Sequence, residues 1–186
     1  MTIAEDKYNS LRLGTGRLGR DIRGHLPTIR KYADHCNYCV EMGVRRVVST
    51  WSFLASKCKK VTSIDITPIS EESLSLLNSA AKEKDIKFEF VLGDTTKIEI
   101  EFCDLLFIDT LHNFSQLSKE LALHGNKARK YLMFHDTTTF GQRDETGSGV
   151  GLQPAIDTFL EENNHWSIEE VFTHDNGLTI LKRNNI

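Results

Sequence analysis

Acidic side chains stand at the ends of five apolar or β-branched runs in this sequence, and they are Glu41, Asp65, Asp94, Asp109 and Asp136. A single acid at such a place has an ordinary explanation, because aspartate accepts hydrogen bonds from nearby backbone amides in turns and helix caps. Capping alone does not readily explain five in succession. If the runs are parallel strands, their carboxyl ends meet at one edge of a sheet, where such sheets bind ligands. We therefore predict the functional site at that edge.

Two of these acids have a spacing that suits a nucleoside ligand. Asp65 follows Gly43 by about 20 residues, which is where an acid that binds ribose hydroxyls is expected after a glycine turn. Asp94 closes the neighbouring strand and could accept a hydrogen bond from an adenine amino group. A nicotinamide dehydrogenase shares the ribose acid, but the G-x-G-x-x-G pattern is missing after the first predicted strand, so we rank that alternative last.

The elements that must position these acids alternate between strands and helices. Predicted strands cover 39–42, 61–66, 86–92, 103–108 and 131–134, and predicted helices cover 26–33, 50–56, 70–80, 114–123 and 154–160. This alternation implies a parallel, doubly wound α/β sheet whose strands are buried on both faces. Asn176-Gly177 between two apolar runs predicts a terminal β-hairpin. We expect one domain over 25–186, preceded by a mobile N-terminal segment over 1–24 that is rich in glycine and arginine.

Composition argues against several classes of protein. The net charge is -3 and the sequence pI is near 6.2, so no basic field favours nucleic acid as a partner. No apolar stretch approaches the roughly 18 residues of a membrane span, and residues 1–10 do not resemble a signal peptide, so we expect a cytoplasmic protein with no membrane partner. A monomer and a homo-oligomer both fit the sequence. The four cysteines are Cys36, Cys39, Cys58 and Cys103. We interpret them as reduced core residues, and the alternative is a redox pair formed by the first two.

Four short stretches together carry a resemblance, and they are Val40-Glu41-Met42-Gly43, Ser63-Ile64-Asp65, Phe107-Ile108-Asp109 and Phe134-His135-Asp136. On these stretches the sequence resembles class I S-adenosylmethionine-dependent methyltransferases, more narrowly the cephalosporin hydroxylase-like and sugar O-methyltransferase branch (methyltransferase family 24-like). The resemblance extends over roughly 21–183 and implies a mostly parallel, seven-stranded sheet of order 3-2-1-4-5-7-6 with an antiparallel C-terminal hairpin. The sequence departs from the family pattern where Val47 replaces a glycine and where Arg45 and Arg46 occupy the first turn.

The resemblance also implies roles in binding S-adenosylmethionine. Glu41 and Gly43 would lie beside the methionine moiety, and Ser49 would lie near its carboxylate. Asp65 would hold the ribose, and Asp94 would face the adenine. The bulky residues in the first turn put cofactor affinity in question, because glycine there permits close backbone approach.

A divalent metal is the second implication of the resemblance. The metal would be held by Asp109, which ends the fourth strand, and by His135 and Asp136, which end the fifth. Carboxylates suit magnesium, whereas an imidazole shifts the preference toward manganese or another transition ion. His112 is a further candidate, either as a ligand or as a base that deprotonates an acceptor hydroxyl. We assign catalytic roles to Asp109 and His112; the alternative is that Asp109 caps its helix and that His135 is packed or solvated.

The function implied is methyl transfer to an oxygen of a small-molecule acceptor, for example a sugar, with Mg or Mn assisting. The competing hypothesis is a non-catalytic or regulatory binding module that retains the methyltransferase fold. Residues 141–151 are interpreted as a lid over the acceptor or as an ordinary connection. Trp51 stacks on a ligand or packs in the core, and the arginines of 10–24 form an anion-binding arm or a solvated terminus.

Overall fold

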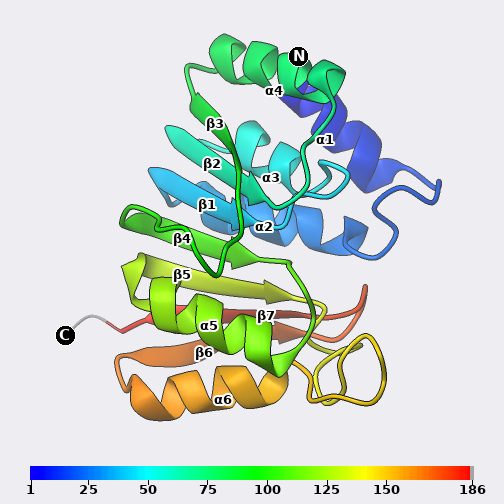
Figure 1. Cartoon of the computed structure of the whole chain (residues 1–186). Coiled ribbons are helices and arrows are strands. Elements are labelled where there is room, and N and C mark those ends of the chain that lie inside the picture. The colour runs from blue at the N-terminus through cyan, green and yellow to red at the C-terminus, as the bar shows by residue number, and fades with distance from the viewer. Residues whose placement is uncertain (185–186) are drawn as a thin grey trace.

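The computed structural model describes residues 1–184 and contains one seven-stranded sheet. The strand order is β3-β2-β1-β4-β5-β7-β6, as predicted (Figure 1). β1 to β5 pair in parallel, whereas β7 is antiparallel to both β5 and β6. The strands are β1 (Tyr38–Met42), β2 (Lys60–Asp65), β3 (Lys87–Leu92), β4 (Cys103–Ile108), β5 (Ala128–His135), β6 (Trp166–Phe172) and β7 (Leu178–Arg183). The doubly wound fold class is confirmed.

The central strands are buried on both faces, which explains their nearly continuous apolar sequences. In β4, Leu105 and Phe107 belong to one core cluster and Leu106 and Ile108 to the other. The parallel register places Met42 of β1 beside Ile108. The last residues of neighbouring strands are therefore brought to the same edge of the sheet.

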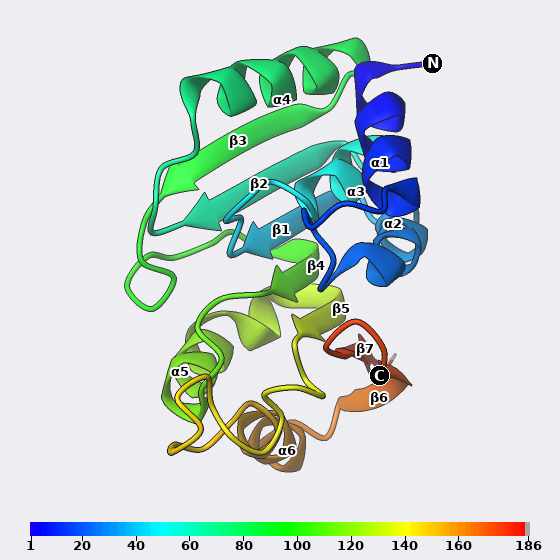
Figure 2. The same ribbon diagram turned by 90° about the vertical axis from the view of Figure 1, so that its right-hand side faces the viewer.

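Helices cover the two faces of the sheet unequally (Figure 2). Four pack on the first core cluster, namely α1 (Ile3–Leu13), α2 (Leu26–Ala33), α3 (Thr50–Ala55) and α4 (Glu71–Glu83). The second cluster is covered by α5 (Phe114–His124) and α6 (Gln153–Glu162), and single 3-10 turns lie at η1 (Arg23–His25) and η2 (Gly125–Lys127). Ser70 caps α4 as predicted, since its side chain accepts a hydrogen bond from the backbone of Ser73.

The N-terminal region differs from our expectation of a mobile segment over 1–24. Its first half forms α1, which buries Ala4 and Tyr8 and packs against α3 and α4. Glu5 of this helix accepts two hydrogen bonds from the Arg30 guanidinium, at 3.0 and 2.6 Å. The spacing of Ala4, Tyr8 and Leu11 was a usable helical signal.

Trp51 and the four cysteines lie in the interior of the protein. Trp51 is only 5% exposed and belongs to the core cluster, so it packs rather than stacking on a ligand. All four cysteines are buried and free. Within residues 1–184, no helix combines the length and apolar character needed to cross a membrane. The expected domain runs to 186, and its last two residues lie outside the described part of the chain.

Candidate active site

Two cavities open beyond the carboxyl ends of the parallel strands. The larger, of about 580 Å³, lies between residues 17–22, the β1–α3 turn and the β6–β7 turn. The second, of about 430 Å³, lies between the ends of β1, β2, β3 and β4. Asp109, the residue after β4, lines both. Both cavities therefore open at the edge of the sheet where we predicted the site, and they share Asp109 and Arg45.

The turn after β1 has three left-handed positions, of which only the first is a glycine. Gly43, Arg45 and Val47 have φ angles of 87°, 47° and 58°. Glycine is required at the first position, because a Cβ there would lie 1.9 Å from the backbone oxygen of Asp109. A β-branched residue in the left-handed region is strained, so this turn holds an unfavourable conformation at Val47.

Asp65 fastens this turn to the end of β2. Its Oδ2 accepts hydrogen bonds from the backbone N–H groups of Val44 and Arg45, at 2.7 and 2.9 Å, and its Oδ1 accepts one from Thr67 at 2.7 Å. Asp65 also lines the second cavity. A carboxylate oxygen accepts two hydrogen bonds, so Oδ1 has capacity for a ligand hydroxyl.

Glu41 and Ser49 are partners of one another. The fully buried Glu41 carboxylate accepts hydrogen bonds from the hydroxyls of Ser49, Thr50 and Ser63, at 2.5, 2.7 and 2.6 Å. Burial raises its pKa to about 7, although the three hydroxyls act in the opposite direction. Glu41 lines neither cavity, whereas Ser49 lines the larger one. Glu41 therefore ties β1, β2 and α3 together behind the site.

Asp94 closes the turn after β3 and borders the second cavity. Its Oδ1 accepts hydrogen bonds from the backbone and hydroxyl of Thr96, at 2.9 and 2.7 Å, and its Oδ2 pairs with Lys97 at 2.8 Å. The Lys97 ammonium and the Thr96 hydrogen bonds lower its pKa to about 2. Asp94 thus faces the same cavity as Asp65, on the neighbouring strand.

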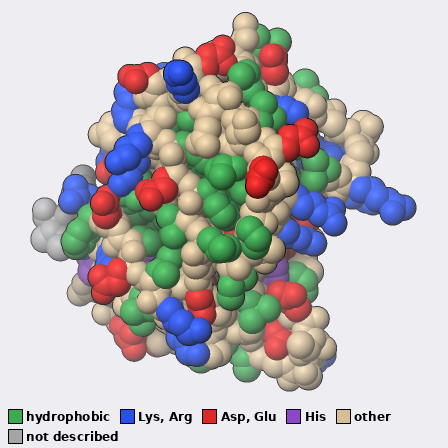
Figure 3. All heavy atoms as spheres, turned by 45° about the horizontal axis from the view of Figure 1, so that its top comes forward, with side chains coloured by type: hydrophobic (Ala, Val, Ile, Leu, Met, Phe, Trp, Pro, Cys, Tyr) green, Lys and Arg blue, Asp and Glu red, His purple; other side chains and the backbone are tan. Residues whose placement is uncertain are grey.

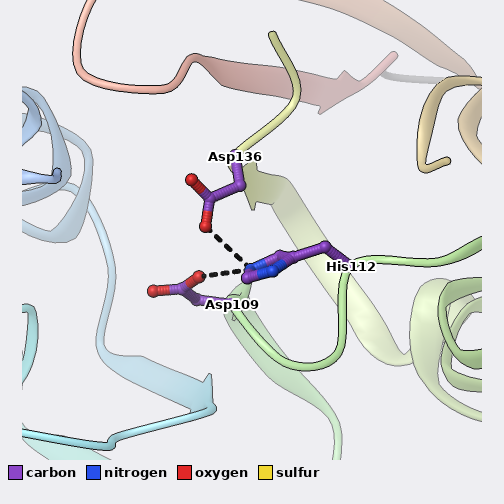
Figure 4. A group of neighbouring side chains, drawn as sticks. All are labelled: Asp109, His112 and Asp136. Carbon is purple, nitrogen blue, oxygen red and sulfur yellow. Dashed lines mark hydrogen bonds and ion pairs between the residues drawn. The ribbon is translucent and has the colours of Figure 1, made fainter. Parts of the chain in front are cut away.

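Two carboxylates and one imidazole converge at the ends of β4 and β5 (Figure 4). The His112 Nε2 lies 2.7 Å from Asp136 Oδ2 and 3.4 Å from Asp109 Oδ1. One ligand atom of each residue lies within 4.8 Å of the other two, which is a spacing that suits a bound metal ion. Asp136 has a φ of 62°, and aspartate tolerates this left-handed conformation. The His112 Nε2 therefore lies within hydrogen-bonding distance of both carboxylates.

His135 lies next to this group but points its second nitrogen elsewhere. Its Nδ1 is 3.3 Å from both Asp109 Oδ1 and Asp136 Oδ2. Its Nε2 lies 3.1 Å from the backbone oxygens of Asp21 and Asp175. Because carbonyl oxygens only accept hydrogen bonds, Nε2 carries a proton. His135 therefore ties the two carboxylates to the segments around 21 and 175.

The acids and imidazoles shift each other's pKa values. Burial favours the neutral imidazoles, but hydrogen bonds and charge from Asp109 and Asp136 outweigh it and raise the pKa of His112 to about 10 and that of His135 to about 11. Burial likewise opposes ionisation of the two carboxylates, yet the histidines hold the pKa values of Asp109 and Asp136 below their usual range.

Sequence reasoning missed two residues that contact His112 from the 137–152 loop. Glu145 Oε1 accepts a hydrogen bond from the His112 backbone N–H at 3.0 Å and lies 2.8 Å from Nδ1 of its ring. The ring of Phe140 stacks on the imidazole with the centroids 4.8 Å apart and the planes at 13°. The loop is thus folded against the site. Its irregular, glycine-rich sequence gave no periodic signal for either contact.

Comparison with known proteins supports the fold. No protein-family model matches the sequence, and the curated proteins give no match. Among solved structures, the chain is similar to magnesium protoporphyrin IX methyltransferase from Synechocystis PCC 6803 with bound S-adenosylhomocysteine, at 18% identity and a TM-score of 0.58, over 97% of this chain and 94% of that one.

Two further solved structures are similar at lower identity. A methyltransferase from Geobacter sulfurreducens matches at 14% identity and a TM-score of 0.57, over 86% of this chain and 78% of that one. Mitomycin 7-O-methyltransferase matches at 15% identity and a TM-score of 0.61, over 88% of this chain and 55% of that one. At these identities the likeness establishes the fold, which is that of S-adenosylmethionine-dependent methyltransferases.

Proposed function

We propose that the protein transfers a methyl group from S-adenosylmethionine to an oxygen of a small-molecule acceptor. The observation that carries this proposal is the position of Asp109, which borders both cavities at the edge of the sheet. A donor in one compartment and an acceptor in the other would meet beside this residue. The sulfonium is already an activated methyl donor, so the protein needs chiefly to align the reactants.

The second cavity suits the adenosine part of the donor. Asp65 and Asp94 border it with carboxylate oxygens, which can accept from ribose hydroxyls and from an amino group. Ser49 borders the larger cavity. We therefore place the methionine moiety and the acceptor in that cavity. The similar protoporphyrin enzyme has a structure with bound S-adenosylmethionine, which supports a donor of this kind.

The residues at the ends of β4 and β5 fit a divalent cation. Asp136 Oδ1 is buried and, within residues 1–184, has no hydrogen-bond partner, as expected of an atom that serves a ligand outside the protein. Two carboxylates with one imidazole suit Mn²⁺, and carboxylates alone suit Mg²⁺. Asp109, His112 and Asp136 would hold the ion, which would lower the pKa of an acceptor hydroxyl. His135 would orient the two carboxylates.

His112 fits the role of a ligand better than that of a general base. Its pKa of about 10 keeps the imidazole protonated at neutral pH, so it has no free nitrogen to accept a proton from an acceptor. A cation bound there would displace the proton from Nε2. Asp109 therefore remains the residue that we place nearest to both reactants.

A second candidate function is a binding module that has the fold without the activity. Arg45 and Val47 favour this candidate. They occupy left-handed positions of the first turn, where glycine would leave more room for a ligand to approach the backbone. The backbone of the turn nevertheless keeps the shape needed for close approach of a ligand. We therefore rank the enzyme first.

Calorimetric titration with S-adenosylmethionine, with and without Mn²⁺, tests the proposal. We expect binding by the wild type and at least tenfold weaker binding by Asp65→Ala. The control is Asp157→Asn, which changes an exposed acid on α6 and should bind as the wild type does. Absence of binding by the wild type under both conditions would contradict the proposed function and favour the binding module.

A further inference from the structure

The larger cavity is lined by an unusual number of arginines for a protein of net charge -3. Arg17 and Arg20 reach it from the segment between α1 and η1, and Arg45 and Arg46 reach it from the β1–α3 turn. Figure 3 shows Lys and Arg side chains gathered at the right-hand edge, the edge to which the strands point in Figure 1. Two segments far apart in the sequence therefore bring positive charge to one compartment of the site.

Three of these guanidinium groups have no acidic partner among residues 1–184. Arg45 pairs with Asp21 at 3.7 Å, across two exposed side chains. For Arg17, Arg20 and Arg46, no carboxylate of residues 1–184 lies within 4.0 Å and no side-chain hydrogen bond is formed. Because like charges around one cavity repel, the arrangement favours an anion between them.

The acids of the same cavity offset its four arginines only in part. Asp21 faces Arg45, and Asp109 is bonded to two histidines. Asp175 accepts a hydrogen bond from the backbone of Gly24 at 2.6 Å and keeps its negative charge, so the four guanidinium groups face only the charges of Asp21 and Asp175. Positive charge therefore remains uncompensated at the mouth of the cavity.

The donor does not account for this charge. The methionine moiety of S-adenosylmethionine carries one carboxylate, which a single guanidinium or a few backbone amides can satisfy. Three further guanidiniums match a group with two or more negative charges. Guanidinium forks bind phosphate oxygens in pairs, so a phosphate or diphosphate is the group that fits best.

We infer that the acceptor is a phosphorylated small molecule, whose phosphate or diphosphate is held by Arg17, Arg20 and Arg46 while its hydroxyl reaches Asp109. The inference rests on the proposed function, because it names the substrate class of the same site. A sugar phosphate and a sugar nucleotide share this chemistry. In both, the phosphoryl group would fix the acceptor at one end of the cavity and leave a sugar hydroxyl free at the other.

The test is calorimetric titration at physiological salt, with inorganic pyrophosphate as the first probe. We expect binding by the wild type and at least tenfold weaker binding by the Arg17→Ala/Arg20→Ala/Arg46→Ala variant. The control removes the same amount of charge from exposed positions away from the site, as Lys7→Ala/Lys59→Ala/Lys119→Ala, and should bind pyrophosphate as the wild type does. Circular dichroism checks that both triple variants are folded.

Three further probes identify the source of the phosphate. Glucose 1-phosphate and UDP-glucose represent the two sources, and glucose is the neutral control, for which we expect no binding. Tighter binding of one phosphorylated probe, lost in the arginine variant, assigns the source. Equal binding of the phosphorylated probes by the wild type and the arginine variant would overturn the inference, as would no binding of any of them.

S-adenosylmethionine is titrated into the same proteins, so that the two proposals fail separately. If the arginine variant loses S-adenosylmethionine and pyrophosphate together, the arginines serve the donor and the inference is wrong. If the wild type binds pyrophosphate but no S-adenosylmethionine, the proposed methyltransferase function fails while the anion site stands.

Discussion

Glu145 contacts His112 at two points, accepting a hydrogen bond from its backbone N–H at 3.0 Å and lying 2.8 Å from its Nδ1. Because Glu145 comes from the 137–152 loop, this pair links the loop to the acid and imidazole cluster. Replacing Glu145 with alanine should loosen residues 143–150 and raise their amide exchange rates about fivefold, as expected for the loss of about 1 kcal/mol of hydrogen bonding.

Hydrogen exchange measured by mass spectrometry checks this prediction. Glu161→Ala, which removes an exposed acid from α6, is the matched control and should leave the loop unchanged. Unchanged exchange in Glu145→Ala would mean that other contacts hold the loop in place.

The two neighbouring arginines of the β1–α3 turn allow a paired test of backbone strain. Arg45 has a φ of 47°, whereas Arg46 is not among the left-handed residues. Arg45→Gly should raise the free energy of unfolding by up to about 1 kcal/mol, because glycine removes the cost of the left-handed conformation. Arg46→Gly should lower it by about 0.5 to 1 kcal/mol, because there glycine adds only flexibility. Urea unfolding measures both, and changes of the same sign would contradict the assignment of strain.

Asp136→Asn tests the cation site directly. The substitution removes one negative charge and makes one atom of the side chain an N–H donor, so Mn²⁺ affinity should fall at least tenfold. Electron paramagnetic resonance of free Mn²⁺ measures the bound fraction, and Asp157→Asn should behave as the wild type does. If Asp136→Asn binds Mn²⁺ as tightly as Asp157→Asn does, the ion binds elsewhere. If neither variant binds Mn²⁺, the proposed cation site is wrong.

Glu41 should make stability depend on pH. Its folded pKa of about 7 lies above the 4.5 of an ordinary glutamate, so between these values the unfolded chain loses the proton first. The contribution is therefore fully present below pH 4.5 and is lost as the pH rises through 7, and the full shift corresponds to about 3 kcal/mol.

The Glu41→Gln variant cannot ionise and should show a flatter profile. Urea unfolding at pH 5 and pH 8 is the measurement, and the difference in stability between the two should shrink relative to the wild type. Exposed Glu89→Gln is the control and should retain the wild-type difference. A profile for Glu41→Gln as steep as that of the wild type would show that another group titrates in this range.

Much of the fold could be predicted from local sequence signals, whereas the hydrogen-bond partners of each acid could not. Apolar runs and the Asn176-Gly177 turn were sufficient to predict the strands, because strands buried on both faces leave a strong pattern. The same sequence could not show that Glu41 would be closed off by three hydroxyls, or that Asp65 would bind two amides of a distant turn. Those bonds depend on how β1 and β2 lie side by side.

The histidines illustrate why spacing alone was insufficient. His135 ends β5 and was predicted to be a ligand. Its Nδ1 faces the two carboxylates, whereas its Nε2 faces backbone oxygens of Asp21 and Asp175, which lie far away in the sequence. His112 adjoins no strand, but the chain after β4 bends it back to Asp136. The way in which each imidazole meets the carboxylates is therefore decided by tertiary contacts.

The position of α1 has a consequence for how this protein can diversify. The segment that leaves α1 forms one wall of the larger cavity, and it is held at one end by that helix and at the other by η1. None of residues 14–22 belongs to a strand, so insertions or exchanges there would reshape the wall without disturbing the sheet. Selection could therefore vary one compartment of the site while the strand ends keep the other constant.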